Sequence, residues 1–369
     1  MQAVAASAAR SPPSRRQRAR RFRLTRARKR VERTGAFPEG APQCRDRGVE
    51  LKMEWKRATS ILLTLLRSKM AYAWRSAWGA SIARLPPSVI EPCAALVCKV
   101  QGLVSARKRW QGIARLEIGR DVLQLAPLEK SRVAAAHLRE KLIDQRIYFG
   151  RLSRGSEAWP DLQRVAAALA GKIRQLQADE PGRPVIVSPF HYVSQYANIY
   201  VIDELRALLG LESIAVVSGV PRDMYGNDHA LIPGVNVLYT YGEDDRNGLG
   251  LRVARALKRS GVVVLFADVP PFALHRYPME TVGVSLFGRN ARIHNGVFRL
   301  GAPFGAVLLP FYLRFDRGRF SAELFDPLPL AAPDAVQQLA RCIESAVTHN
   351  YSDWLVAGHP SMYAFAPVR

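Results

Sequence analysis

The sequence has few of the residues that build metal sites or disulfide frameworks. It contains four cysteines and seven histidines in 369 residues. Cys44, Cys93, Cys98 and Cys342 form no CxxC pair, and no histidine lies at zinc-ligand spacing from any of them. We therefore expect no metal, and we interpret the chain as a reduced, intracellular protein whose cysteines are small buried side chains.

Long apolar runs are also missing. No stretch of 18 consecutive apolar residues occurs, so the sequence predicts no transmembrane helix. The first residues lack the apolar segment of a cleavable signal peptide. Helix-turn-helix, RNP and zinc-finger patterns are absent too, and we therefore expect no nucleic acid partner.

Negative charge is scarce. The chain has 54 Lys and Arg against 31 Asp and Glu, a net charge of +23. The first 50 residues hold 14 basic and 4 acidic residues, so +10 of that charge lies there. Such an excess attracts polyanions, which include anionic lipid headgroups, phosphorylated substrates and nucleic acid.

Composition divides the chain into three predicted parts. Residues 1–52 are predicted to be a disordered basic extension. Three alternatives stay open for it: an arm for anionic membrane or nucleic acid, a transit peptide, or upstream codons before a true start at Met53. Residues 53–150 are predicted to be helical. Within them, residues 54–83 mix leucines, tryptophans and cations, which fits a membrane-interfacial helix or a helix packed on the domain.

Residues 151–369 alternate between short apolar runs and amphipathic helices. Continuously apolar strands separated by helices indicate an α/β fold, a mainly parallel sheet flanked by helices. The predicted strands are 185–187, 214–217, 235–239, 262–266, 307–313 and 320–325, and the predicted helices are 122–147, 161–177, 196–209, 248–259 and 334–348.

Polar residues follow two of the predicted strands. In parallel sheets, functional sites gather beyond the carboxyl ends of strands. His191 comes after the 185–187 strand, and Asp268 comes after the 262–266 strand. A histidine there could act as a general base near neutral pH, or it could be a structural residue that caps the next helix.

A second candidate group lies at Phe287, Gly288 and Arg289. This segment follows a predicted strand, and we expect it to enter a helix. Gly288 would let the backbone approach a ligand, and Arg289 would offer a bidentate fork for phosphate. His294, a few residues later, could be a second group in the cleft, and we interpret it as structural.

Taken together, residues 184–354 resemble the lysophospholipid and lipid A biosynthesis acyltransferases, of the lauroyl/myristoyl transferase type. The order and spacing of several blocks carry the resemblance. These blocks are Val185–His191, Gly261–Asp268 followed by Val282–Ala291, Gly301–Pro310 and Asn350–Trp354.

The resemblance implies an acyltransferase at the cytoplasmic face of the bacterial inner membrane, attached peripherally. The histidine would take a proton from an acceptor hydroxyl on a lipid-type or amphiphilic molecule. That hydroxyl would attack a thioester of acyl carrier protein or coenzyme A, with no further cofactor. The expected partners are this donor and an anionic membrane surface. The resemblance also makes Arg222, Arg289, Phe287, Gly288 and Ser194 candidate substrate-binding residues.

The sequence departs from the family at one position. The family pairs its histidine with an acid in an H-x4-D/E motif, and here that position holds Tyr196. The phenol of tyrosine is uncharged at neutral pH, so it cannot supply the negative charge of a carboxylate. Four alternatives follow: Tyr196 or Ser194 holds the imidazole, Asp268 supplies the carboxylate, the acceptor is an amine, or the chain is an impaired relative that binds lipid or acyl carrier protein.

Overall fold

The computed structural model describes residues 69–70, 74, 77–125, 128–154, 159–219, 232, 234–239, 248–271, 280–358 and 363–365. Contacts divide the chain into two units, Met1–Ala77 and Trp78–Arg369. The sheet and the helices around it belong to the second unit. The predictions for residues 1–52 and for most of 54–83 lie outside the described residues, although residues 77–83 are helical.

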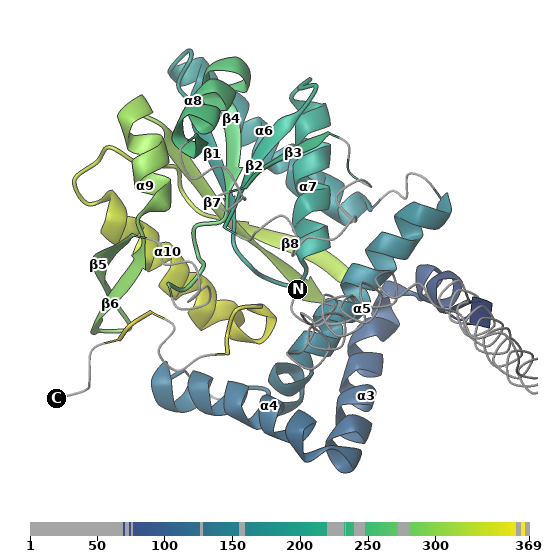
Figure 1. Cartoon of the computed structure of the whole chain (residues 1–369). Helices are drawn as coiled ribbons and strands as arrows, with labels where there is room; N and C mark the ends of the chain where they lie inside the picture. Colours follow the sequence, from purple (N-terminus) through teal and green to yellow (C-terminus); the bar gives the residue numbers. More distant parts are fainter. Residues whose placement is uncertain are drawn as a thin grey trace, which may run out of the picture. The chain divides into compact units, whose positions relative to one another are not determined.

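Seven strands of the described chain form one sheet, in the order β3-β2-β4-β1-β7-β8, with β9 also paired to β7 (Figure 1). The first five in this order run parallel to their neighbours, and β8 and β9 are antiparallel to β7. The mainly parallel sheet is therefore confirmed. The strands are β1 Val185–Pro189, β2 Ile214–Ser218, β3 Val235–Tyr239, β4 Val262–Leu265, β7 Val307–Asp316, β8 Arg319–Leu324 and β9 Leu328–Pro329.

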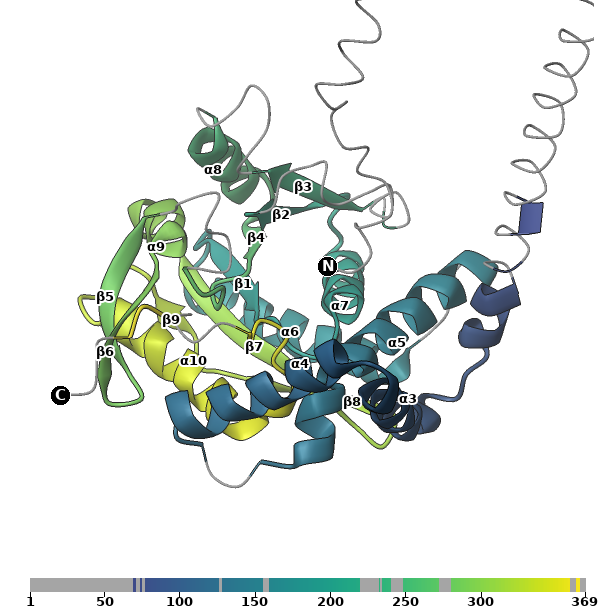
Figure 2. The same cartoon turned by 60° about the horizontal axis from the view of Figure 1, so that its bottom comes forward.

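Helices cover both faces of the sheet (Figure 2). The crossover from β1 to β2 and that from β3 to β4 run in opposite directions along the sheet, and right-handed crossovers then put their helices on opposite faces. The first face carries α6 Pro160–Asp179 and α7 Gln195–Leu208. The second carries α8 Leu249–Ser260, α9 Gly296–Gly301, the short helix η6 Ala302–Phe304 and α10 Ala335–Asn350, which leads into η7 Tyr351–Asp353.

The core forms because β1 and β4 are made almost entirely of apolar residues. Every residue of β1 is buried, as are the three valines that open β4. Helix α6 contributes an apolar stripe, with Leu162, Leu169 and Ile173 fully buried. Helix α8 ends at Gly261, whose left-handed φ of 69° closes the helix.

The N-terminal region of this unit is helical, as predicted. The short helix η2 Pro87–Val89 leads into α3 Ile90–Val104, followed by α4 Ala106–Glu117, a π-helical turn η3 Ile118–Val122, and α5 Lys130–Arg154. The predicted helix over 122–147 is wrong at its start. The chain leaves helical geometry after Val122, with Gln124 at a φ of 53°, and becomes helical again at Lys130.

The prediction that Phe287 to Ala291 enter a helix is also wrong. These residues belong to a separate two-stranded hairpin, β5 Thr281–Leu286 and β6 Arg289–His294. Phe287 and Gly288 form its two-residue turn, with φ values of 52° and 67°. Two successive positive φ values match the right-handed twist of a hairpin, so the strand reverses here.

Candidate functional site

His191 and Asp268 form a hydrogen-bonded pair. Imidazole Nδ1 lies 2.7 Å from Asp268 Oδ1, and the backbone N–H of His191 donates to Asp268 Oδ2 at 2.8 Å. The two residues come just after β1 and β4, which are neighbouring parallel strands. The carboxyl ends of parallel strands meet at one edge of the sheet, and the pair forms because both residues emerge there.

The pair combines a buried carboxylate with a partly accessible imidazole. The Asp268 side chain is 1% exposed, whereas that of His191 is 15% exposed. With Nδ1–H donating to the carboxylate, the neutral ring keeps its lone pair on Nε2. Nothing among the described residues hydrogen-bonds Nε2, so this nitrogen remains able to take a proton from another molecule.

Contacts behind the carboxylate fix its loop. The backbone N–H of Ala267 donates to the Ser188 hydroxyl at 3.1 Å, which ties the end of β4 to β1. The Tyr363 hydroxyl donates to the Asp268 carbonyl oxygen at 3.0 Å. The ring of Phe266 lies 4.6 Å from the imidazole, centroid to centroid. These contacts leave the imidazole and the carboxylate little freedom to separate.

The loop that carries His191 is clamped by the segment after α10. The backbone N–H of Val193 donates to the Asp353 carbonyl, and that of Leu355 donates to the His191 carbonyl, both at 2.8 Å. Val193 adopts a φ of 64°, a strained value for a β-branched residue. Buried Arg139 pairs with the Asp353 carboxylate and also donates to the Ser352 carbonyl at 2.7 Å. Strain held in place by surrounding contacts is typical of functional loops.

Tyr196 and Ser194, both predicted near the imidazole, have other partners. The Tyr196 ring packs edge-on against Tyr148, and the backbone N–H of Tyr196 donates a hydrogen bond to Asp144 Oδ1 at 3.3 Å. The Ser194 side chain is buried at the start of α7, where its hydroxyl donates to Asp144 and accepts the N–H of Ala197. Of the predicted acid alternatives, Asp268 is the one that contacts the imidazole.

Asp144 is a titratable group that the sequence did not reveal. It lies on α5, opposite the first turn of α7. The pKa of its carboxyl is raised to about 7, first by burial and then by the charge of Glu140, one turn earlier. The hydrogen bonds from Ser194 and from the Tyr196 backbone act in the opposite direction. A negative charge at this helix start also interacts favourably with the α7 dipole.

The second predicted group does not join the pair. The Arg289 guanidinium donates to the Val122 carbonyl at 3.2 Å and lies 4.7 Å from the centre of the Phe365 ring. Phe287 donates its backbone N–H to Glu344. Burial lowers the pKa of His294, and its structural role stays a prediction. Arg222 lies outside the described residues, so its predicted substrate contact stays a prediction.

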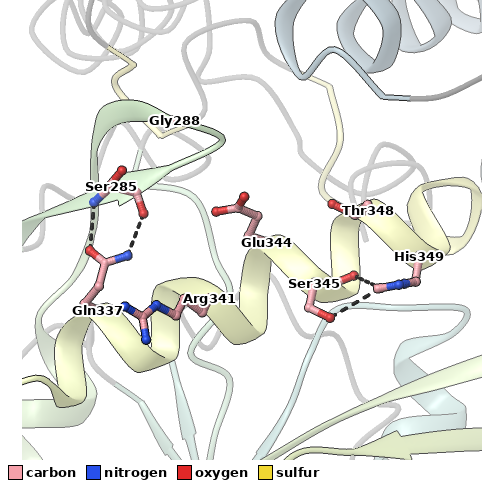
Figure 3. Close-up of a pocket in the computed structure, with 8 residues that line it drawn as sticks. All are labelled: Ser285, Gly288, Gln337, Arg341, Glu344, Ser345, Thr348 and His349. Atoms are coloured by element: carbon pink, nitrogen blue, oxygen red, sulfur yellow. Dashed lines mark hydrogen bonds between the residues drawn. The ribbon is translucent and has the colours of Figure 1, made fainter.

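Two hollows in the described surface lie away from His191. One, of about 730 Å³, runs between α10 and the hairpin, where the Gln337 amide pairs with the backbone of Ser285 (Figure 3). The other, of about 550 Å³, lies beside the clamp residue Asp353. The chain segments that follow β2, β3 and β4, residues 220–231, 240–247 and 272–279, lie outside the described residues. Within the described chain, no group of three or more His, Cys, Asp or Glu side chains could hold a metal ion.

The sequence offered few signals for the supporting residues. Asp353 belongs to one of the blocks that carried the resemblance, but nothing in that block indicated a contact with the histidine loop. Arg139 and Asp144 sit among other charges on α5 and look like ordinary surface residues. Tyr363 follows the last of those blocks. Comparison of the chain with protein-family models gives no match, and comparison with curated proteins gives no relative.

Proposed function

We propose that the chain is an acyltransferase that moves a fatty-acyl group from an acyl thioester to a hydroxyl of a lipid-type or amphiphilic acceptor. The single observation that carries this proposal is the His191–Asp268 pair at the carboxyl ends of β1 and β4. A histidine with one ring nitrogen fixed by a buried carboxylate is an arrangement that supports general-base catalysis.

The proposed reaction follows from the two ring nitrogens. Nε2 of His191 accepts the acceptor's hydroxyl proton while the hydroxyl oxygen bonds to the thioester carbonyl carbon. The C–S bond then breaks, and the imidazolium returns the proton to the departing thiolate. Throughout, Asp268 keeps Nδ1 protonated and stabilises the positive charge that develops on the ring.

Asp268 also bears on the non-catalytic alternative. That alternative rested on the tyrosine at the family's acid position. Because Asp268 supplies a carboxylate to His191 from another strand, the absence of an acid at Tyr196 no longer favours a binding protein. The donor, acyl carrier protein or coenzyme A thioester, and the location at the cytoplasmic face of the inner membrane are part of the same proposal.

The test is release of free thiol from an acyl thioester donor, with transfer measured by mass spectrometry of the acceptor. We expect His191→Ala to lower turnover by about 10²–10⁴-fold. Asp268→Asn should lower it by up to about 10⁴, as loss of the orienting charge does in triad hydrolases. Tyr196→Phe is the matched control, and its turnover should stay close to the parent's.

Two outcomes would contradict the proposal. Equal turnover in the His191→Ala variant and the parent would remove the histidine as base. If Tyr196→Phe lost activity while Asp268→Asn kept it, Tyr196 and not Asp268 would be the residue that orients His191. Melting temperatures of all variants separate loss of chemistry from loss of folding.

A further inference from the structure

Helices α3 and α4 expose an unusual number of large apolar side chains. Leu103 and Val104, at the end of α3, are 83% and 82% exposed, and Trp110 of α4 is 61% exposed. Leu96, Val97 and Val100 extend the same surface along α3. Residues 96, 100, 103 and 104 follow helical spacing, so they share one face. We call these six residues the α3–α4 surface.

The opposite sides of the two helices are packed on the domain. Ile90 and Ala94 of α3 are 1% exposed and face α5. Gly112 of α4 sits so close to Ala134 of α5 that an added Cβ would lie 3.0 Å from the Ala134 Cβ. Both helices are therefore held in place by α5, and the α3–α4 surface faces outward. Apolar patches of this kind on soluble proteins usually mark an interaction site.

Between Glu91 and Glu117, the charge along the two helices has one sign. Residues 92–116 contain five cationic side chains and no Asp or Glu. Arg115 is engaged with backbone carbonyls of the segment after α10. The other four, Lys99, Arg107, Lys108 and Arg109, are exposed beside the apolar residues. Aliphatic side chains, a tryptophan and cations without acids match the interface of an anionic bilayer.

The contacts of α3 favour a helix that lies on the bilayer. In the described chain, Pro87–Val104 is the one segment long and apolar enough to cross a membrane, by length and composition alone; the sequence pattern predicted none. However, Glu91 at its start pairs with Arg132 at 3.4 Å and accepts the Arg317 backbone N–H at 2.8 Å. Crossing the membrane would break these contacts and expose the side that packs on α5.

We propose that the α3–α4 surface docks the protein on an anionic lipid bilayer, with Leu103, Val104 and Trp110 inserted at the interface and Lys99, Arg107 and Lys108 near the headgroups. The inference rests on the proposed function in one respect, the location of the protein at a membrane, and it adds which surface makes the contact. It also assigns the contact to described residues 96–110, whereas the sequence pattern placed a possible interfacial helix at 54–83, with a helix packed on the domain as the equal alternative.

Vesicle co-sedimentation of the full chain tests the proposal. The probes are phosphatidylcholine vesicles with and without phosphatidylglycerol. Arg107→Gln with Lys108→Gln removes two cations and should weaken binding to the anionic vesicles about thirtyfold. Leu103→Ser with Val104→Ser should weaken binding as strongly, and quenching of tryptophan fluorescence by brominated lipid should fall in Trp110→Phe.

Matched controls come from α8, at the far end of the unit from α4 in both views (Figures 1 and 2). Leu251 is 58% exposed, and Arg259 lies in the last turn of the helix. Leu251→Ser with Arg259→Gln should bind vesicles like the parent. All the replaced side chains are exposed, so melting temperatures should stay unchanged.

Several results would overturn the proposal. Unchanged vesicle binding in both α3–α4 variants would assign any membrane contact to another part of the chain. Equal binding to neutral and anionic vesicles would remove the role of the cations. If light scattering showed that the parent is a dimer and the Leu103→Ser, Val104→Ser variant is a monomer, the α3–α4 surface would bind a second copy of the chain instead of a bilayer. Turnover on a water-soluble donor and acceptor separates this proposal from the proposed function, since the α3–α4 variants should retain turnover and His191→Ala should lose it.

Discussion

Ser194 joins two helices through one oxygen atom. Its hydroxyl donates to Asp144 of α5 at 2.5 Å and accepts the N–H of Ala197 in the first turn of α7 at 2.9 Å. The helix that begins here follows the loop of His191 directly. Ser194 therefore couples the position of α5 to the loop that presents the imidazole.

Replacing Ser194 by alanine should destabilise the fold by about 2–4 kcal/mol. Loss of an N-cap costs about 1 kcal/mol, and leaving a buried acceptor without its donor costs about 1–3 kcal/mol more. Urea unfolding measures this free energy. Ser105→Ala is the matched control, because Ser105 caps α4 through a longer bond of 3.5 Å in an exposed position. An equal loss in both variants would contradict the buried coupling.

Stability should fall as the pH rises toward neutrality because of Asp144. Its pKa is about 7 in the folded chain and about 3.9 in an unfolded one. Between these values the folded state binds the proton that the unfolded state has released. The stabilising contribution is therefore complete below about pH 4 and is lost progressively as the pH rises to the folded-state pKa of about 7.

Asp144→Asn tests this pH dependence, because the amide oxygen can still accept from Ser194. The variant should gain stability relative to the parent as the pH rises from about 4 to about 7, measured by urea unfolding at each pH. A constant difference between variant and parent across that range would show that Asp144 does not titrate there.

The clamp on the histidine loop should depend on the buried ion pair. Asp353→Ala leaves Arg139 charged and unpaired in the interior, which costs about 3–5 kcal/mol. Asp316→Ala is the matched control: Asp316 pairs with Arg132 at 3.2 Å, but its side chain is 65% exposed, so the expected loss is about 0–1 kcal/mol. Thermal unfolding of both variants checks the contrast, and similar losses would contradict it.

Two glycines should respond to alanine in opposite directions. An added Cβ at Gly301 would lie 2.3 Å from Leu330 Cδ1 and 2.8 Å from Ile186 Cδ1, so overpacking should destabilise by about 1–3 kcal/mol. Gly171, exposed inside α6, has nothing within 4 Å of such an atom. Alanine there should stabilise the fold by about 0.5–1 kcal/mol. Urea unfolding of the two single variants decides whether the sheet and α9 are packed this closely.

The strands and most helices followed from the sequence because their signals are local. Val262–Leu265 is continuously apolar and follows a glycine stop, which fits a buried parallel strand. The strand before Phe287 was predicted, since Val282, Val284 and Leu286 alternate with other residues, the period of a half-buried strand. The return strand β6 was missed. Phe287-Gly288 is not one of the usual hairpin dipeptides, so the turn was interpreted as a ligand loop.

The candidate site could be predicted in its parts but not in its assembly. His191 and Asp268 were both identified at the ends of strands. Their contact depends on β4 lying beside β1, although β2 and β3 come between them in the chain. Strand order is a long-range property that local patterns do not encode. The contributions of Asp144 and Asp353 depend in the same way on how α5 packs against α7 and η7.

The strand order also determines how the imidazole and carboxylate respond to local unfolding. Both residues leave strands that are paired on each side, β1 between β4 and β7, and β4 between β2 and β1. Fraying of β3 or β8 at the sheet margins leaves those pairings intact. The backbone amide hydrogens of Val185, Val187 and Val263 should then exchange with deuterium only through global opening, and the pair should persist until the whole domain unfolds.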